Sequence, residues 1–419
     1  MLSGAITRLR ALWVDRLTRN IGWLFLFQIS TYLSLLLIIP WLTHTLPVAE
    51  YGATMAIMAA AQFCFIVTDY GFTASATYEV SCHRQDDATV QGIIRDVHGA
   101  KVFLVCASCI GLWGLSYIPS YQPYSVLFLY GGLAVILQAY QPIWLLQGLE
   151  NMRAYAMYMV LVRISFMVMV FGLVRSPGDG SLVLLALMLS NLLGTLLGLR
   201  ALQAAGYRAW SLCLLGGLRM MRCTAGYFWG RLAFALYSSF NSIVLGAAAL
   251  SQAGIFNAAE QVYKAGQSVG GPISQAMLPA LARARDTRLV WKILPALIGV
   301  LGLGCAIVAA MAPWLIQLAF GSAYAGSVPV LYVFLVTIPV SVTGMVLGYP
   351  WFAALGSPGA VNITLIMAAA LHLGLLALLW WLDRLTAYNV ALCVLATESF
   401  MLLMRLTLGF ALVRSARAS

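Results

Sequence analysis

The sequence predicts an all-α polytopic membrane protein with about twelve transmembrane helices. Hydrophobic residues make up 62% of the 419 residues and charged residues only 9%, and the mean hydropathy is +0.91. A soluble domain carries roughly 25% charged residues. The apolar residues also gather into stretches of the ~20 residues that a helix needs to cross a hydrocarbon layer of about 30 Å. Basic residues fall mainly between alternate stretches.

Each predicted helix is one such apolar stretch, bounded by polar or charged residues. In chain order the predicted spans are 21–43, 52–78, 98–118, 124–147, 155–174, 181–201, 225–247, 252–279, 291–315, 326–349, 360–382 and 388–412. The longest polar connections lie near 80–97 and 202–224. Neither connection is long enough to form a soluble domain.

The positions of lysine and arginine predict the orientation, because these residues are enriched in cytoplasmic loops. One set of alternate loops, together with both termini, holds 18 of the 24 basic residues: Arg8, Arg10, Arg16, Arg19, Arg84, Arg95, Lys101, Arg153, Arg200, Arg208, Arg219, Arg222, Arg283, Arg285, Arg288, Lys292, Arg414 and Arg417. The opposite loops hold Arg175 and Arg384, and the remaining four lie inside spans. Both termini are therefore expected in the cytoplasm. The net charge of +11 reflects this topology and anionic lipids, and it gives no support to nucleic-acid binding.

The first and second halves of the chain resemble each other. Residues 46–52 precede a long apolar span, and residues 250–256 do the same about 205 residues later. The fourth predicted span ends with Pro142-Ile143-Trp144, and the tenth ends with Pro350-Trp351. These two echoes predict a duplicated six-helix unit, which many secondary transporters place around a central site.

The repeat predicts a chain of three parts. Residues 1–20, in which apolar residues recur at helical spacing among arginines, form an amphipathic helix on the cytoplasmic surface. Residues 21–205 form an N-lobe with helices 1–6. Residues 206–419 form a C-lobe with helices 7–12 and a cytoplasmic C-terminal tail.

A cluster of helix-weakening residues interrupts the eighth span. Gly270, Gly271 and Pro272 follow one another in its middle. Proline removes a backbone donor and glycine favours a bend, so the three residues are candidates for a hinge. A static kink at a packing site is the alternative, since both residue types are frequent in transmembrane helices.

Several short motifs give the sequence a specific resemblance. They are Tyr51-Gly52, Asp69-Tyr70-Gly71-Phe72 with Ser75-Ala76-Thr77, Ala258-Ala259-Glu260-Gln261 with Lys264, Pro272-Ile273-Ser274-Gln275-Ala276 with Pro279, and Phe320-Gly321-Ser322-Ala323-Tyr324. In these motifs the chain resembles the polysaccharide-repeat flippases of the O-antigen type, and the resemblance runs from about residue 20 to the C-terminus. These flippases belong to the multidrug/oligosaccharidyl-lipid/polysaccharide superfamily. The motifs do not indicate which sugar is carried.

The resemblance implies two six-helix lobes around a central cavity in the bacterial inner membrane. It implies that undecaprenyl-diphosphate-linked oligosaccharide repeat units, of O-antigen or a related surface polysaccharide, move from the cytoplasmic to the periplasmic leaflet by alternating access. Implied partners are this lipid-linked oligosaccharide, bilayer lipids and glycan-assembly proteins such as the repeat polymerase. No cofactor is expected except H⁺ or Na⁺ as coupling ion of an antiport, because the sequence contains no nucleotide-binding Gly-x-x-x-x-Gly-Lys-Ser/Thr loop.

Ionisable residues inside the predicted spans are the candidate site residues, because charge within a membrane is costly and usually faces a cavity. The basic candidates for a cationic cavity that binds the diphosphate are Arg163, Arg231, Lys264 and Arg405. The acidic candidates for ion coupling are Asp69, Glu260 and Glu398.

These candidates have structural alternatives. Glu260 and Lys264 stand four residues apart, in the order that favours an ion pair within one helix. Arg231 lies close enough to the membrane interface to extend its side chain to water. The remaining alternatives are that Arg405 pairs with Glu398, that Asp69 bonds its own helix end, and that His372 packs in span 11 instead of relaying protons.

Two other classes of function remain as alternatives. A small-molecule or multidrug antiporter of the same fold would need acidic groups for cations, whereas the membrane-embedded candidates here are mainly basic. A membrane enzyme acting on lipid-linked glycan would need a catalytic loop, and the sequence has no Asp-x-Asp motif. The eight cysteines show no metal-ligand spacing, so no metal site is expected.

Overall fold

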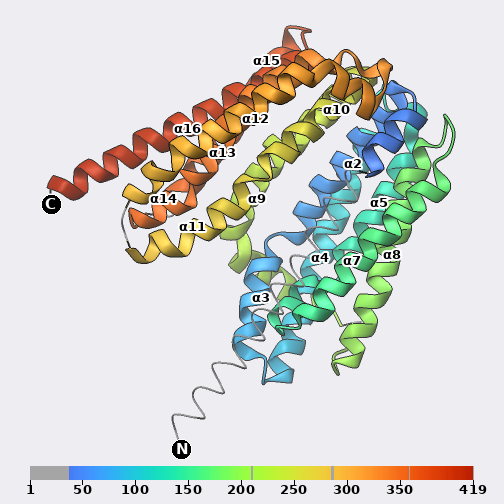
Figure 1. Cartoon of the computed structure of the whole chain (residues 1–419). Helices are drawn as coiled ribbons and strands as arrows, with labels where there is room; N and C mark the ends of the chain where they lie inside the picture. Colours follow the sequence, from blue (N-terminus) through green and yellow to red (C-terminus); the bar gives the residue numbers. More distant parts are fainter. Residues whose placement is uncertain (1–36, 209–210, 285–286, 358, 419) are drawn as a thin grey trace, which may run out of the picture. The chain divides into compact units, whose positions relative to one another are not determined.

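The computed structural model describes residues 37–208, 211–284, 287–357 and 359–418, and over these ranges the protein is all-α (Figure 1). The described residues form α-helices and two short 3-10 turns, η1 (Gln122–Tyr124) and η2 (Ser322–Tyr324), and no β-strand. The predicted all-α fold is confirmed. The predicted surface helix over residues 1–20 and most of the first predicted span lie outside the described residues.

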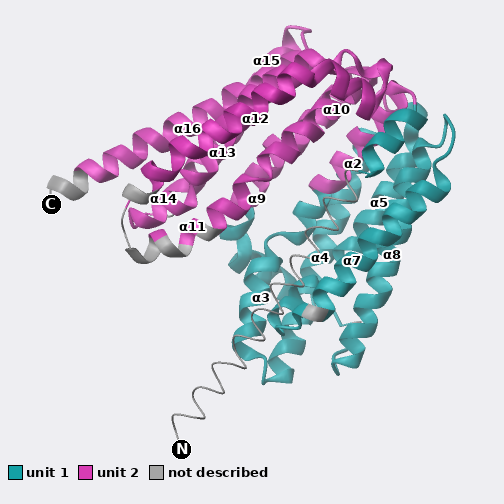
Figure 2. Cartoon of the chain, viewed as in Figure 1, with its two compact units in different colours: residues 1–46, 64–117, 122–228 teal, residues 47–63, 118–121, 229–419 magenta. Residues whose placement is uncertain are grey.

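The chain divides into two compact units, which Figure 2 shows in different colours. Unit 1 comprises the described residues of 1–46, 64–117 and 122–228, and unit 2 comprises those of 47–63, 118–121 and 229–419. Two of the borders fall inside helices, namely α2 (Val48–Asp69) and α9 (Leu214–Ala248). The predicted lobes over 21–205 and 206–419 stay predictions.

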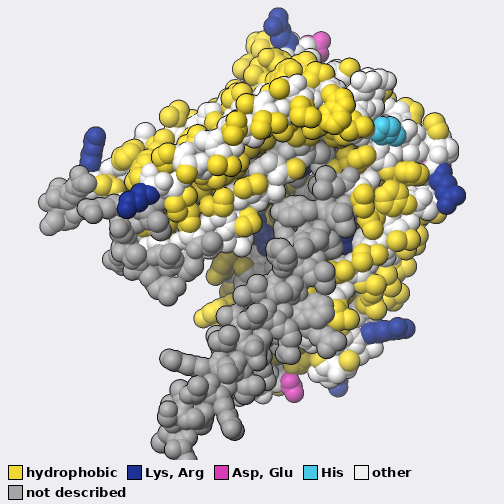
Figure 3. All heavy atoms as spheres, in the orientation of Figure 1, with side chains coloured by type: hydrophobic (Ala, Val, Ile, Leu, Met, Phe, Trp, Pro, Cys, Tyr) yellow, Lys and Arg dark blue, Asp and Glu magenta, His cyan; other side chains and the backbone are white. Residues whose placement is uncertain are grey.

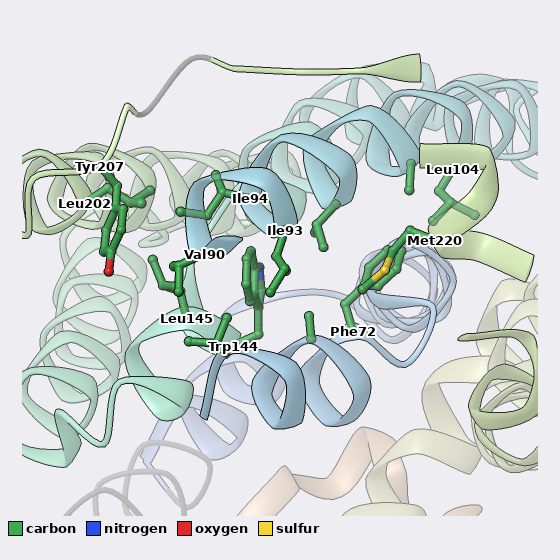
Figure 4. Close-up of a cluster of buried hydrophobic side chains, with 14 residues drawn as sticks. Phe72, Val90, Ile93, Ile94, Leu104, Trp144, Leu145, Leu202, Tyr207 and Met220 are labelled. Carbon is green, nitrogen blue, oxygen red and sulfur yellow. The ribbon is translucent and has the colours of Figure 1, made fainter. Parts of the chain in front are cut away.

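Unit 1 is built from helices that pack in pairs. Besides parts of α2 and α9, its helices are α3 (Phe72–His83), α4 (Asp87–Leu115), α5 (Ser125–Ala139), α6 (Ile143–Gly148), α7 (Met152–Leu173) and α8 (Gly180–Ala204). Helix α8 packs against α5 and α7, and α3 packs against α4 and α6. At one end of the unit, apolar side chains from α3, α4, α6 and the 202–220 region form a buried core (Figure 4). This core includes Phe72, Ile94, Trp144 and Tyr207.

Unit 2 repeats this construction. Its further helices are α10 (Leu250–Gln267), α11 (Gly270–Ala284), α12 (Arg288–Phe320), α13 (Ser327–Val346), α14 (Tyr349–Ala354), α15 (Ala360–Trp381) and α16 (Ala387–Ala418). Helix α13 packs against α10, α12 and α16, and α16 also packs against α15. A core around the fully buried Trp351 holds α11, α12, α14 and α16 together.

The helix breaks occur in the same order in both halves. Helices α2 and α3 are separated at Tyr70–Gly71, and α10 and α11 at Ser268–Val269. Each half then contains a long helix that gives way to a short one: α5 to α6 in the first half, and α13 to α14 in the second. Helix α5 begins at Ser125 and α13 begins at Ser327. Their separation is close to the offset between the two similar halves of the sequence. The internal repeat is therefore visible in the secondary structure.

The first of these breaks depends on a glycine. Gly71 has a φ of 93°, in the left-handed region that favours glycine. A Cβ at this position would lie 2.9 Å from the Cβ of Tyr227. The Asp69 carboxylate at the end of α2 accepts hydrogen bonds from the backbone N–H of Thr73, at 3.3 Å, and from its hydroxyl. A side chain at position 71 would therefore strain the turn and its packing.

Several helices extend beyond the predicted spans, because hydropathy detects only their apolar parts. Helix α4 begins at Asp87 instead of residue 98, so much of the expected connection over 80–97 is helical. Asp86 caps this helix by accepting a hydrogen bond from the Thr89 backbone N–H at 3.2 Å. The side chain and backbone of Thr89 hold the pKa of Asp86 below its ordinary value. Polar helix extensions of this kind carry no hydropathy signal.

The described surface is that of a multi-pass membrane protein. By length and composition, nine helices or helix pairs within the described residues are apolar enough to cross a membrane. In Figure 3 hydrophobic side chains cover most of the described surface in view, and charged side chains form a few isolated patches. Helix α12 shows this clearly, because only 6% of its most apolar window is buried inside the protein. The count of twelve spans stays a prediction.

The orientation can be tested by labelling single cysteines in a variant without the eight native ones. Gln85 and Ser176 are both exposed and lie at opposite ends of the intervening spans. We expect Ser176→Cys to react with a membrane-impermeant maleimide in intact cells, and Gln85→Cys to react only after permeabilisation, because the basic loops are retained inside. External labelling of Gln85→Cys would contradict the predicted topology.

The close approach of α2 and α10 gives a stability prediction. A Cβ on Gly52 would lie 1.9 Å from the Leu250 carbonyl oxygen and 2.8 Å from the Gly254 nitrogen. We expect Gly52→Ala to destabilise the protein by about 1–3 kcal/mol, because the backbones must separate. The matched control is Gly302→Ala, whose Cβ would meet nothing within 4 Å. Thermal unfolding of the purified variants in detergent measures both, and an equal effect at the two sites would contradict the close packing.

Candidate functional site

Unit 2 contains a cavity of about 300 Å³ with charged and polar groups in its wall. Its lining comes from α9, from the α10–α11 break, and from α13, α14, α15 and α16. The polar and charged lining residues are Tyr237, Gln267, Ser274, Gln275, Ser341, Tyr349, Glu398 and Arg405. Two of the sequence candidates, Glu398 and Arg405, thus lie in one cavity.

Arg405 is held in this cavity by two neighbouring helices. Its side chain is buried, with 6% exposed. Its Nη1 donates to the Gly344 carbonyl oxygen at 2.5 Å, and its Nε donates to the Thr364 hydroxyl at 3.2 Å. A guanidinium has five N–H donors, so these bonds leave donors available to an anion in the cavity. The field of the Glu398 carboxylate also acts on this cation.

Glu398 lies at the end of a chain of hydrogen bonds. The Tyr263 hydroxyl donates to its Oε1 at 3.3 Å, and Gln267 Nε2 donates to the Tyr263 oxygen at 2.9 Å. The Gln267 amide also donates to the Ser341 hydroxyl at 2.9 Å. The carboxylate itself is 2% exposed. A buried acid needs such partners, because an unpaired charge is costly inside a protein.

A second, smaller hollow of about 40 Å³ adjoins the cavity and shares Phe234, Tyr237 and Gln267 with it. This polar hollow contains the other charged pair, Glu260 and Lys264. Lys264 Nζ lies 2.9 Å from Glu260 Oε2, and the glutamate side chain is 6% exposed whereas the lysine side chain is 45% exposed. The predicted pairing within the helix is therefore present. The exposed ammonium remains able to contact a further anion.

The predicted hinge residues lie where unit 2 breaks its helix. Helix α10 ends at Gln267 and α11 begins at Gly270, so Gly270, Gly271 and Pro272 form the first turn of α11. Gly271 lines the cavity, and a Cβ on Gly270 would lie 2.6 Å from the Met345 sulfur. The break is thus part of the cavity wall. Movement at the break stays a prediction.

Arg163 lies on α7 of unit 1 and is half-buried. Its position is about 100–160° around the helix from the exposed Met157, Leu161, Ile164 and Val168, so it lies off the exposed apolar side of α7. Among the residues that the structure describes, it has no hydrogen-bond or ion-pair partner. Arg231 on α9 is exposed and does have an interaction partner, and it is absent from the lining of the unit 2 cavity.

In unit 1 the structure corrects the predicted location of Lys101 and shows the hydrogen bonds of Asp69. Lys101 was assigned to a cytoplasmic loop, but it lies within α4, is 4% exposed and donates to the Ala139 carbonyl. The field of Asp69 acts on this lysine. Asp69 also bonds Thr73 at the helix break, which is the structural role given as its alternative. The early start of α4 explains the wrong assignment of Lys101.

Unit 1 also has a larger hollow, which is of a different kind. It measures about 660 Å³ and lies along α7 and α8. Its lining is almost entirely apolar, with Asn151 and Tyr158 as its polar members. This chemistry does not suit a phosphate group, so size alone does not identify the functional site.

The sequence did not predict the uncharged half of the unit 2 site. Tyr263, Gln267 and Ser341 form the hydrogen-bonded chain that ends at Glu398, yet none of them is distinguished in the sequence from many similar residues. A usable signal was present in α10, where Glu260, Tyr263, Lys264 and Gln267 recur at intervals of three and four residues and therefore share one face of the helix.

Comparison with known proteins places the chain in a family. The family described as "Polysaccharide biosynthesis protein" matches residues 17–285. A protein of Escherichia coli (strain K12) named "Putative O-antigen transporter" is 26% identical over 329 residues, which cover 76% of this chain and 79% of that protein. A protein of the same name from Shigella dysenteriae is 26% identical over 277 residues, covering 63% and 67%.

Solved structures of transporters share the fold. The lipid II flippase MurJ in an inward closed conformation matches with a TM-score of 0.72 and 12% identity, covering 91% of this chain and 87% of that one. An inward-facing multidrug resistance MATE transporter of the MOP superfamily matches with a TM-score of 0.64 and 13% identity, covering 92% and 99%. The two relatives are named as transporters, and these structures are of a flippase and a transporter, not of enzymes.

Proposed function

Because this chain belongs to the polysaccharide biosynthesis protein family, we propose that it is a flippase for lipid-linked oligosaccharides. The proposed substrate is an undecaprenyl-diphosphate-linked repeat unit of O-antigen or a related surface polysaccharide. The protein moves it from the cytoplasmic to the periplasmic leaflet of the bacterial inner membrane, with both termini in the cytoplasm. The names of the two relatives and the fold shared with a lipid II flippase support this proposal.

The substrate poses a specific physical problem. Its polyprenyl tail is soluble in the membrane, whereas its diphosphate and sugars are not, and moving unpaired charge into hydrocarbon costs many kcal/mol. A flippase must therefore supply cations for the phosphates together with hydroxyl, amide and aromatic groups for the sugars. The repeat polymerase on the outer side is the proposed recipient of the translocated unit.

The unit 2 cavity carries the proposal, because it combines both kinds of group. Arg405 offers unused guanidinium donors at its wall, and Lys264 offers an ammonium in the adjoining polar hollow. Tyr237, Tyr349, Gln267 and Ser274 supply uncharged polar and aromatic groups. Arginine suits phosphate well, because its planar donors bond two oxygens at once.

The remaining candidate residues also receive proposed roles in transport. Arg163, which has no partner among the described residues, is a proposed phosphate contact on unit 1, and Arg231 is a weaker one on α9. Glu260, Glu398 and Asp69 stay candidates for the H⁺- or Na⁺-coupling acids of an antiport. The helix break at Gly270, Gly271 and Pro272 is the proposed hinge for alternating access in unit 2.

The first prediction concerns Arg163. We expect Arg163→Ala to reduce surface glycan by at least about tenfold, because losing one charge contact to a diphosphate in a low-dielectric site costs more than 1.4 kcal/mol. Arg163→Lys should retain part of the activity. The measurement is surface glycan per unit of membrane protein in a strain lacking the chromosomal copy, with Arg175→Ala in a predicted outer loop as control. Wild-type export by Arg163→Ala would remove this residue from the site.

The second prediction separates pairing from transport at Glu260 and Lys264. The double variant Glu260→Lys with Lys264→Glu keeps an i, i+4 pair in reversed order. We expect it to restore the protein abundance that Lys264→Gln or Glu260→Gln lowers, but not export, because the new charges stand one helical turn, about 5–6 Å, from their required places. Protein level and surface glycan are measured together. Full export by the double variant would assign both residues a purely structural role.

A further inference from the structure

His372 on α15 is a titratable side chain that the proposed function leaves without a role. It is fully buried in unit 2. Its Nδ1 lies 2.9 Å from the Thr397 hydroxyl oxygen on α16, and its Nε2 lies 2.7 Å from the Asn241 side-chain oxygen on α9. Both ring nitrogens thus have a close polar neighbour, and the histidine joins three helices.

Both neighbours of the ring already donate a hydrogen bond to a backbone carbonyl of their own helix. The Thr397 hydroxyl donates to the Cys393 carbonyl at 2.8 Å, and the Asn241 amide nitrogen donates to the Tyr237 carbonyl at 3.2 Å. Each neighbour therefore presents an oxygen acceptor to the imidazole ring. The ring meets acceptors on both sides.

A neutral imidazole cannot satisfy both acceptors, because it carries one N–H and one bare nitrogen. If Nε2 carries the proton, Thr397 must turn from Cys393 to give Nδ1 a donor. If Nδ1 carries it, Asn241 must turn its amide and give up its bond to Tyr237. The protonated ring donates from both nitrogens and keeps all four hydrogen bonds.

We propose that His372 is a reversible proton-binding site inside unit 2, and that this proton is the coupling ion of transport. The coupling role rests on the proposed function, whereas the proton-binding site does not. The bound proton forms one N–H bond on the ring, is taken from water and is returned to water. No other bond changes.

The surroundings allow a charged ring without leaving it isolated. Tyr237 on α9 packs edge-on against His372, with ring centroids 6.3 Å apart, and it also reaches the Glu398 carboxylate. On α16, which packs against α15, Cys393, Glu398 and Arg405 lie within eight residues of Thr397, Tyr388 and Arg414 lie farther along the same helix, and Tyr349 lies on α14. Glu398 follows Thr397 directly, so an acid lies on the same helix as one of the ring's acceptors. A buried cation requires such compensation.

The ring also connects to the proposed substrate site through one of its hydrogen-bond partners. Asn241, which bonds the ring, lines the polar hollow together with Glu260 and Lys264. This hollow adjoins the cavity that contains Arg405. A proton on His372 would add positive charge beside the groups proposed to hold a diphosphate, which is how proton binding and substrate binding would influence each other.

The proton site itself is tested by nitrogen NMR of purified protein with ring-labelled histidine. The His372 signals are assigned by difference from His372→Gln, and exposed His83 serves as the internal control. Between about pH 5 and pH 8, we expect the His372 ring to pass reversibly from a doubly protonated to a neutral form. Signals of a neutral ring throughout this range would overturn the proposal.

Two variants test the role of the acceptors. Thr397→Val removes the acceptor at Nδ1 and should move the His372 titration midpoint to lower pH by about one unit or more, because a hydrogen bond to a charged group is lost. Asn241→Asp places a carboxylate at Nε2 and should move it to higher pH. An unchanged midpoint in both correctly folded variants would overturn the assignment of the ring's partners.

Coupling is tested in vesicles that contain the protein and an undecaprenyl-diphosphate oligosaccharide. A pH gradient should accelerate translocation by the wild type, whereas the rate measured for His372→Gln should be the same with and without the gradient. A full response by His372→Gln would overturn the coupling role. If the wild type moves no lipid-linked oligosaccharide, the proposed function fails, and the NMR titration still decides the proton site.

Discussion

The cost of charge in hydrocarbon is the constraint on which the rest of this structure depends. It explains why charged residues are 9% of the chain and why those within the helices are few. It also explains their surroundings. Glu260 pairs with Lys264, Glu398 accepts from Tyr263, Arg405 donates to Gly344 and Thr364, and Lys101 donates to Ala139. Each of these groups therefore has a partner inside the protein that compensates part of the cost of its charge.

The same constraint makes the unit 2 cavity the most informative part of the molecule. Its charges are incompletely saturated, since the buried Arg405 keeps unused donors and Lys264, in the adjoining polar hollow, is half-exposed. A site of this kind can exchange an internal partner for an external anion at moderate cost. A fully saturated pair could not do so without leaving a buried charge alone.

The sequence was sufficient for the fold class and for the charged part of the site. Apolar length and composition alone predict the membrane helices, and depth within a span alone selects Glu398 and Arg405. The start of α4 was not predictable from hydropathy, because residues 87–97 are helical but polar. The wrong assignment of Lys101 followed from that.

The uncharged members of the site could not be predicted from the sequence for a different reason. Their role depends on contacts between α10, α13 and α16, which are far apart in sequence. The residues that make these contacts are Tyr263, Gln267 and Ser341. His372 belongs to the same class. Its identity suggests packing, and only the orientation of Thr397 and Asn241 gives its ring two acceptors.

The fold is shared by flippases and by multidrug transporters, so substrate chemistry separates the proposed function from a small-molecule antiporter. The most direct measurement uses vesicles containing purified protein and a fluorescent undecaprenyl-diphosphate oligosaccharide, with a membrane-impermeant glycosidase to report leaflet position. We expect protein-dependent translocation that Arg405→Gln strongly reduces and that organic cations do not inhibit. Transport of organic cations without any translocation of the lipid-linked oligosaccharide would contradict it.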